Sequence, residues 1–158
     1  MKVLVIGSKG FIGSNLLKYL HDKGYEVWGA DVLSDNVNKK HFFQVEAKCP
    51  DYNTIFQQGT YNLCINCSGA ASVPGSIENP VHDYCLNTVN VFKILAAIKS
   101  FQPECKFINL SSAAVYGNPQ HLPVDERAIL NPLSPYGIHK LQSKQICKEF
   151  FTYYKIKT

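Results

Sequence analysis

The chain has 158 residues, of which 46% are apolar and 18% are charged, a composition that suits one globular domain and excludes a disordered or fibrous protein. The formal net charge of +4 is spread along the chain, which argues against a nucleic acid as partner. No stretch approaches the roughly 20 apolar residues of a membrane span, and the first apolar run is too short for a signal peptide. We therefore expect a cytoplasmic protein without a membrane partner.

Short apolar runs alternate along the chain with segments that carry helical periodicity. The runs predict strands at residues 2–6, 25–30, 42–45, 63–67 and 106–110. Helices are predicted at residues 12–23, 51–58 and 81–99, and a last helix begins at Pro135 with Ser134 as its N-cap. Residues 32–41 and the proline-rich residues 118–135 are expected to be loops. The alternation predicts an α/β fold with a doubly wound parallel sheet, a Rossmann fold with helices on both faces, in one domain spanning residues 1–158.

Six cysteines are present, but the chain has a normal core composition and no secretory signal, so we expect free thiols. Cys64 and Cys67 form a C-x-x-C motif inside a predicted strand. Residues three apart on a strand face opposite sides of the sheet, which argues against a metal site.

Three glycines, Gly7, Gly10 and Gly13, lie between the first strand and the first helix. Such glycines permit a tight turn, close approach to a pyrophosphate and packing of the helix on the strand, and the helix N-terminus favours an anion. Asp31 follows the second strand, where a carboxylate accepts the ribose hydroxyls of NAD and repels a 2′-phosphate. The alternatives are a plain tight turn and an ordinary loop aspartate. Together these residues predict an NAD site.

Tyr136 and Lys140 stand four residues apart on the last predicted helix and therefore share a face. A nearby ammonium stabilises a phenolate, so Tyr136 is a candidate base for an alcohol proton. Ser112 follows the fifth strand, at the edge where parallel strands assemble ligand sites, and is a candidate for hydrogen bonding to the substrate hydroxyl; Ser111 is its nearest rival. The alternatives are a surface pair and a serine that closes a turn. The combination indicates redox chemistry on a sugar-like alcohol.

Three segments together resemble the extended short-chain dehydrogenase/reductases, the NAD-dependent epimerase/dehydratase family that acts on nucleotide sugars. They are residues 7–13 (GSKGFIG), 111–117 (SSAAVYG) and 131–140 (NPLSPYGIHK). The resemblance runs over the whole chain and corresponds to about the N-terminal half of such an enzyme. It implies that a smaller C-terminal substrate domain lies outside this chain, and that the chain alone is inactive.

The resemblance also implies the roles of individual residues. The catalytic residues would be Ser112, Tyr136 and Lys140. The NAD-binding residues would be Gly7, Gly10, Phe11, Ile12, Gly13, Asp31, Glu46, Ala70, Ala71, Asn87, Tyr136 and Lys140. Glu46 stands where the family often has an aspartate that reaches the adenine, and Asn87 matches an asparagine that supports the active site.

The implied activity is that of a nucleotide-sugar 4-epimerase. Such an enzyme oxidises the sugar C4 hydroxyl with NAD, turns the 4-keto sugar over and returns the hydride to its other face. Alternatives are a nucleotide-sugar dehydrogenase or ketoreductase, a 4,6-dehydratase, and a non-catalytic NAD-binding module. Dehydration is disfavoured because Ala113 and Ala114 stand where dehydratases carry carboxylic side chains. The partners expected are a nucleotide-diphosphate sugar and a second copy, as a homodimer through residues 89–98 and 136–150.

Overall fold

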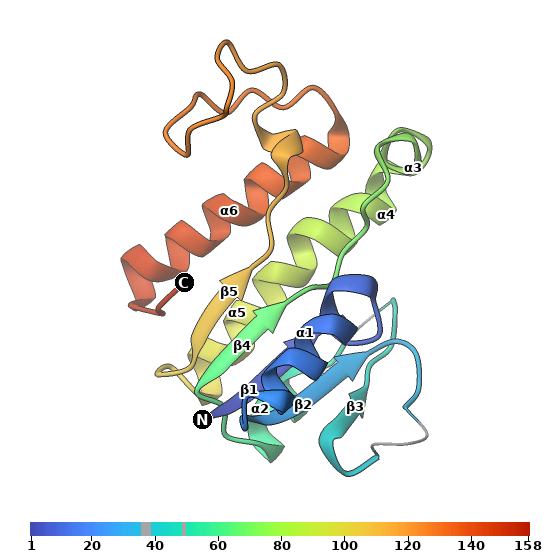
Figure 1. The fold of residues 1–158 in the computed structure, drawn as a ribbon, viewed down its shortest axis with the longest axis vertical. Coiled ribbons are helices and arrows are strands. Elements are labelled where there is room, and N and C mark those ends of the chain that lie inside the picture. Colours follow the sequence, from blue (N-terminus) through green and yellow to red (C-terminus); the bar gives the residue numbers. More distant parts are fainter. Residues whose placement is uncertain (36–38, 49) are drawn as a thin grey trace.

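In the part of the chain that the structure describes, five parallel strands form one sheet in the order β3-β2-β1-β4-β5 (Figure 1). The structure is a computed structural model that describes residues 1–35, 39–48 and 50–158. The strands are β1 (Lys2–Ile6), β2 (Glu26–Asp31), β3 (Phe42–Gln44), β4 (Leu63–Asn66) and β5 (Lys106–Asn109). The longer helices are α1 (Phe11–Asp22), α2 (Tyr52–Gln58), α5 (Asn90–Phe101) and α6 (Pro135–Tyr154). The predicted α/β fold with a parallel sheet is confirmed.

The two faces of the sheet are covered by different helices, as alternation along β1 shows. Val3 and Val5 pack in an apolar cluster with residues of α1. Leu4 and Ile6 point the other way, into the larger cluster built with α2, α5 and the end of α6. Because side chains alternate along a strand, the continuous apolar run of β1 supplies both cores. The centre of the sheet is therefore buried on both sides, as is typical of parallel sheets, whereas Ile108 on the edge strand β5 is 47% exposed.

The strands end level with one another at one edge of the sheet. Ile6 of β1 pairs with Ala30 of β2 and with Asn66 of β4, and Asn66 pairs with Asn109 of β5. The residues that follow these positions therefore meet at the same edge. This register positions the site described below, because ligands of such sheets bind beyond the carboxyl ends of the strands.

The segment predicted as one helix at residues 81–99 is more complex, so that prediction is corrected. α4 (Pro80–Tyr84) passes through a π-helical turn, η2 (Cys85–Val89), into α5, and a further short helix, α3 (Val73–Glu78), precedes α4. Asn79 caps α4 by accepting a hydrogen bond from the His82 N–H at 3.1 Å. Prolines at the starts of α3 and α4 resemble loop signals in the sequence, although proline is also favoured in the first helical turn.

Smaller differences affect the loops. A 3-10 turn, η1 (Lys39–His41), closes the segment predicted as a loop at residues 32–41, whose residues 36–38 lie outside the described residues. Asp31 is the last residue of β2 and not the first residue after it. The predicted start of α6 is confirmed, since Ser134 Oγ accepts the Gly137 N–H at 3.1 Å and Pro135 opens the helix. No helix in the described part of the chain is long and apolar enough to cross a membrane.

The C-x-x-C pair lies across the sheet, as the spacing predicts. Cys64 belongs to the cluster on one face and Cys67 packs against the cluster on the other. Burial raises the pKa of the Cys67 thiol to about 11, so this thiol is neutral near pH 7 and a weak nucleophile. Among the described residues, no group of three or more His, Cys, Asp or Glu side chains is placed to hold a metal ion.

Candidate functional site

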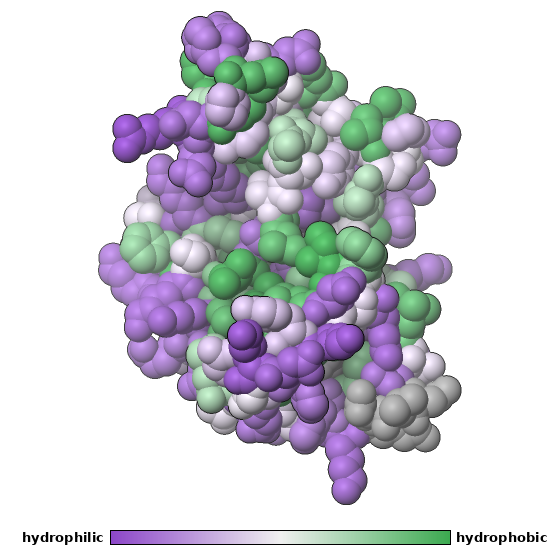
Figure 2. Space-filling view, viewed as in Figure 1, coloured by the Kyte–Doolittle hydropathy of each residue, from purple (hydrophilic) through white to green (hydrophobic). Residues whose placement is uncertain are grey.

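A groove of about 480 Å³ runs along the carboxyl ends of β1, β2 and β4. Four of the residues predicted to bind NAD line it, namely Gly7, Gly10, Asp31 and Glu46. The predicted residues Phe11 and Ile12 lie at the start of α1, where they are 87% and 55% exposed. On the face of the molecule seen in Figure 2, apolar side chains gather in a band across the middle, among hydrophilic surroundings.

The glycine loop is packed so tightly that two of its glycines tolerate no side chain. Gly7 has a φ of +76°, and a Cβ on it would lie 2.6 Å from the Ser68 backbone nitrogen. A Cβ on Gly13 would collide with the Gly7 carbonyl oxygen. Gly10 differs, because a Cβ there would have one neighbour, the same oxygen, at 3.4 Å. The loop thus leaves free space at Gly10, where the groove passes the N-terminus of α1.

Asp31 is fixed at the end of the groove by backbone donors. One carboxylate oxygen accepts the Lys9 N–H at 2.8 Å and the other accepts the Leu33 N–H at 3.0 Å. The Lys9 ammonium itself lies 2.6 Å from a carboxylate oxygen of Asp35. Since each carboxylate oxygen can accept more than one hydrogen bond, Asp31 keeps capacity for a ligand hydroxyl.

Tyr136 and Lys140 are buried one turn apart on α6, with exposed fractions of 9% and 7%. Lys140 Nζ donates to the Leu110 carbonyl at 2.9 Å, just beyond the end of β5. Burial lowers the pKa of Lys140, and the negative charge of Asp83 acts in the opposite direction. The surface-pair alternative for Tyr136 and Lys140 is therefore wrong, because both side chains are inside the protein.

Ser112 is tied to the same end of α6 through the 3-10 turn η3 (Ala113–Val115). Ser112 Oγ accepts the Ala114 N–H at 3.2 Å and so caps this turn. The turn packs directly on α6, since a Cβ on Gly137 would lie 2.7 Å from the Ala114 carbonyl oxygen. Ser112 is half-buried, whereas its rival Ser111 is exposed. The fold therefore brings the serine segment to the turn of α6 that holds Tyr136.

Asn87 joins this cluster from the π-helical turn. It is 1% exposed, and its Nδ2 donates to Asp83 Oδ1 at 3.1 Å. A Cβ placed on Gly69 would lie 2.5 Å from Asn87 Oδ1 and 3.7 Å from Lys140 Nζ. Both polar atoms therefore border the same small space at the end of the groove. The predicted residues Ala70 and Ala71 follow Gly69 directly, Ala70 half-buried and Ala71 exposed.

Several residues at the site were not among those predicted from the sequence. Cys67, Ser68 and Gly69 line the groove together with His82 and Leu86. The first three could have been predicted from their position after a buried strand. His82 and Leu86 come from a helical segment in which nothing distinguishes them from other surface positions.

Ser76 is a further residue that the sequence analysis missed, and it holds the backbone of Tyr136. The Tyr136 N–H donates to Ser76 Oγ at 3.1 Å, and that hydroxyl donates to the Val73 carbonyl at 2.7 Å. Ser76 is fully buried. It satisfies one of the backbone donors that the first turn of any helix leaves free.

We expect Ser76→Ala to destabilise the fold by about 1–3 kcal/mol, because the buried Tyr136 N–H loses its acceptor. That change corresponds to about 2–4 °C of melting temperature per kcal/mol for a chain of this size. Thermal denaturation followed by circular dichroism tests it. Ser100→Ala, at an exposed position of α5, is the matched control and should leave the melting temperature almost unchanged. Equal melting curves for the two variants would contradict this role of Ser76.

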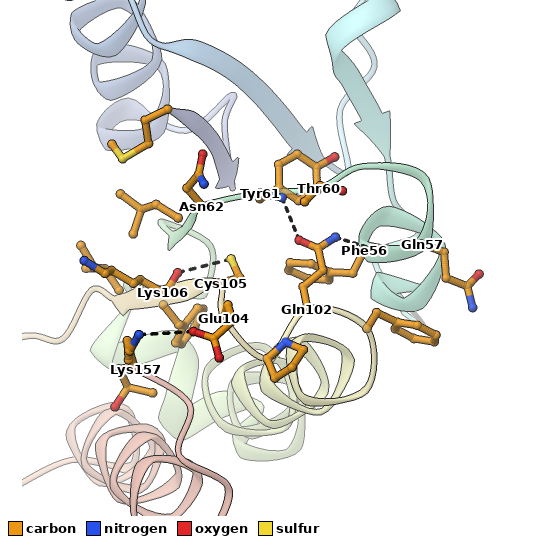
Figure 3. Close-up of a pocket in the computed structure, with 17 residues that line it drawn as sticks. Phe56, Gln57, Thr60, Tyr61, Asn62, Gln102, Glu104, Cys105, Lys106 and Lys157 are labelled. Carbon is orange, nitrogen blue, oxygen red and sulfur yellow. Dashed lines mark hydrogen bonds and ion pairs between the residues drawn. The ribbon is translucent and has the colours of Figure 1, made fainter.

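A wider hollow of about 1400 Å³ lies near the amino-terminal ends of β1, β4 and β5 (Figure 3). Gln102 stands in it with its side chain bonded to the Tyr61 N–H, and Lys157 pairs with Glu104 at 3.4 Å. Both side chains of this ion pair are exposed to solvent. The hollow lies away from the edge where the strand ends assemble polar groups, so we place the functional site in the groove.

Residues 3–158 match the profile of the NAD dependent epimerase/dehydratase family. The chain belongs to this family. NAD is the cofactor of the family, and the groove fits it on structural grounds. The glycine loop of this epimerase/dehydratase chain excludes side chains at Gly7 and Gly13 and leaves room at Gly10. It continues into α1, whose N-cap residue, Gly10, has no side chain that could occupy the helix N-terminus.

Individual relatives agree with this assignment. The chain is 32% identical over 159 residues to a Methanocaldococcus jannaschii protein with the provisional name of a UDP-glucose 4-epimerase, covering 98% of this chain and 52% of that protein. It is 29% identical over 165 residues to the UDP-glucose 4-epimerase of Bacillus subtilis, covering 96% and 48%. Among solved structures it is similar to the UDP-glucose 4-epimerase of Brucella ovis in complex with NAD, with a TM-score of 0.87, 28% identity, and coverage of 98% and 49%. The chain spans about half the length of the curated relatives it matches.

Proposed function

We propose that this chain is the NAD-binding and catalytic-residue half of a nucleotide-sugar 4-epimerase. The observation that carries the proposal is the buried pair of Tyr136 and Lys140. Lys140 Nζ borders the space beside Gly69 and Asn87, at the end of a groove that begins at the glycine cradle. The names of the relatives as UDP-glucose 4-epimerases support it. The smaller substrate domain, a homodimer and a cytoplasmic location belong to the same proposal.

The reaction assigns a separate task to each side chain. Bound NAD supplies the carbon that accepts hydride from the sugar and returns it. The Tyr136 phenolate takes the proton of the sugar C4 hydroxyl, and the buried Lys140 ammonium stabilises this phenolate by its charge. Ser112 hydrogen-bonds the same sugar oxygen as it changes from hydroxyl to carbonyl. Returning the proton from Tyr136 to the oxygen completes the cycle, so that no net proton is consumed.

The proposal is tested on the polypeptide that contains this chain, as its source cell produces it. With UDP-glucose or UDP-N-acetylglucosamine as substrate, this polypeptide should form the C4 epimer without net reduction of NAD. Proton nuclear magnetic resonance distinguishes each substrate from its C4 epimer. Ala113 and Ala114 offer no carboxylic group for elimination, so no dehydrated sugar should form. Loss of water from the sugar, or reduction of NAD in proportion to product, would overturn the 4-epimerase assignment.

Asp31 determines the preference for NAD in this proposal. We expect Asp31→Ser to weaken NAD binding by about 10- to 100-fold, because hydrogen bonds to a charged group contribute about 1.5–3 kcal/mol. Binding of NADP should weaken less or improve, since the repulsion of its 2′-phosphate is removed. Isothermal titration of both cofactors checks this. Asp22→Ser, at an exposed position on α1, is the control, and an unchanged ratio of the two affinities in Asp31→Ser would contradict the assigned contact.

A further inference from the structure

His139 and Asp83 form a buried pair beside Lys140 that the proposed reaction does not use. His139 directly precedes Lys140 on α6, and its Nδ1 lies 2.6 Å from Asp83 Oδ2 on α4. The two side chains are 12% and 3% exposed. The ring of Tyr84 meets the imidazole edge-on with 5.2 Å between centroids. The pair is therefore held inside the protein by packing as well as by its hydrogen bond.

Asp83 determines which way the Asn87 amide faces. An ionised carboxylate only accepts hydrogen bonds, so the Asn87 nitrogen, at 3.1 Å, must be the atom that faces Asp83 Oδ1. The Asn87 oxygen is then directed to the other side, toward the space that Lys140 Nζ also borders. This oxygen is buried and has no hydrogen-bond partner in the described part of the protein. Asp83 thus presents an acceptor at the end of the cofactor groove.

Burial lowers the pKa of Lys140, and the negative charge of Asp83 acts against this effect. A buried ammonium is costly unless a negative charge lies nearby. Among the carboxylates of residues 1–35, 39–48 and 50–158, Asp31 and Asp83 are buried, and Asp31 is engaged at the end of β2 with the Lys9 and Leu33 N–H groups. Other titratable side chains on α3, α4 and the π-helical turn, and within one turn of Lys140 on α6, are Glu78, His82, Tyr84, Cys85, Tyr136, His139 and Lys144. Of these, Glu78 carries a carboxylate and is exposed.

We propose that His139 and Asp83 are positioning residues for the reaction proposed above: His139 holds the Asp83 carboxylate, which orients the Asn87 amide and supplies the negative charge that keeps Lys140 protonated. The inference rests on the proposed function only for the catalytic role of Lys140, which is to stabilise the Tyr136 phenolate. The 2.6 Å contact between His139 Nδ1 and Asp83 Oδ2 fixes the position of the carboxylate. The histidine therefore serves as an anchor, and Asp83 as the counter-ion.

The proton affinity of Lys140 is the quantity that tests this role. Lysine labelled with ¹³C at Cε reports it by nuclear magnetic resonance in the 158-residue chain without NAD or sugar, with Lys140→Arg identifying the resonance. Asp83→Asn keeps the size of the side chain and removes its charge, so the pKa of Lys140 should fall by about one unit or more. Asp22→Asn removes the charge of an exposed His–Asp pair on α1, His21 and Asp22, and should cause no shift.

Two substitutions at His139 separate anchoring from simple packing. His139→Asn places an amide nitrogen near the position of Nδ1 and should leave the Lys140 titration close to that of the unsubstituted chain. His139→Leu fills similar space without a donor, and should shift the Lys140 titration in the same direction as Asp83→Asn. If Asp83→Asn does not fold, as judged by circular dichroism, the comparison of His139→Asn with His139→Leu alone tests whether His139 anchors Asp83.

An unchanged titration of Lys140 in folded Asp83→Asn, or equal titrations in His139→Asn and His139→Leu, would overturn the proposal. The result is independent of the proposed function, because neither cofactor nor sugar takes part. A shifted Lys140 in a protein that acts on no nucleotide sugar would reject the 4-epimerase assignment and retain the role of the pair.

Discussion

Tyr136→Phe should lower the rate of hydride transfer from a nucleotide sugar by about 100- to 10 000-fold, the range that a positioned acid–base group contributes. Tyr136 is 9% exposed and stands one turn before Lys140 on α6. A phenyl ring fits the same space, so the substitution removes the hydroxyl and leaves the packing. The measurement is a single turnover of the polypeptide that contains this chain with UDP-glucose, followed by the ultraviolet absorbance of the reduced nicotinamide.

The control for this loss lies on the same helix. Tyr153 is 75% exposed near the end of α6, and Tyr153→Phe should transfer hydride at the rate of the unsubstituted protein. Binding of NAD to Tyr136→Phe is measured in parallel, because a large loss of cofactor would lower the rate for another reason. A Tyr136→Phe protein that binds NAD and transfers hydride at full rate would show that another group takes the proton.

The features that could be predicted from the sequence are those with a local physical cause. The turn at Gly7 and the tight contact between Gly7 and Gly13 are consequences of a glycine spacing that is visible in the sequence. Ser134 and Pro135 specify the start of α6 by the same chemistry in any chain. Because α6 begins there, Tyr136 and Lys140 fall one turn apart, and their common face follows from helical periodicity.

The features that could not be predicted depend on contacts between distant segments. Asp83 and His139 are 56 residues apart in sequence, and Ser76 and Tyr136 are 60 apart. The sequence around one residue of a pair does not reveal which residue it contacts, because the contact arises only when α3 and α4 pack against α6. The π-helical turn that places Asn87 was missed for a related reason, since residues 81–99 carry ordinary helical periodicity. Such turns are frequent at functional sites, and here one buries a polar side chain at the end of the groove.

The order of α4, the π-helical turn and α5 connects the fold with the chemistry. Asp83 lies at the end of α4, Asn87 within the turn and Asn90 at the start of α5. Asn90 Oδ1 accepts the Tyr52 hydroxyl at 2.7 Å, and its Nδ2 donates to Ser68 Oγ at 3.1 Å. One continuous helical segment thus supplies polar groups along the groove, from the Lys140 end to the residues that follow β4. A change in the helical phase at the turn would rotate Asn90 on α5 relative to Asp83 on α4, so the two side chains could not both keep their contacts.

The two glycines of the cradle should separate cofactor binding from folding. A methyl group on Gly10 would meet the Gly7 oxygen at 3.4 Å, and the backbone there, with φ −70° and ψ 169°, suits alanine. We expect Gly10→Ala to keep nearly the melting temperature of the unsubstituted chain. It should weaken NAD binding by about 10- to 100-fold, because the backbone can no longer approach the pyrophosphate closely.

Gly13→Ala should lose both properties. Its methyl group would collide with the Gly7 carbonyl oxygen, a backbone atom that cannot rotate away, so α1 must shift from β1. Overpacking of this kind costs about 1–3 kcal/mol, or about 2–4 °C of melting temperature per kcal/mol, and it displaces the loop that holds NAD. Thermal denaturation and isothermal titration with NAD are measured on both variants. Full NAD affinity in Gly10→Ala would place the pyrophosphate elsewhere than at the N-terminus of α1, and an unchanged melting temperature in Gly13→Ala would show that the contact between Gly7 and Gly13 can relax without cost.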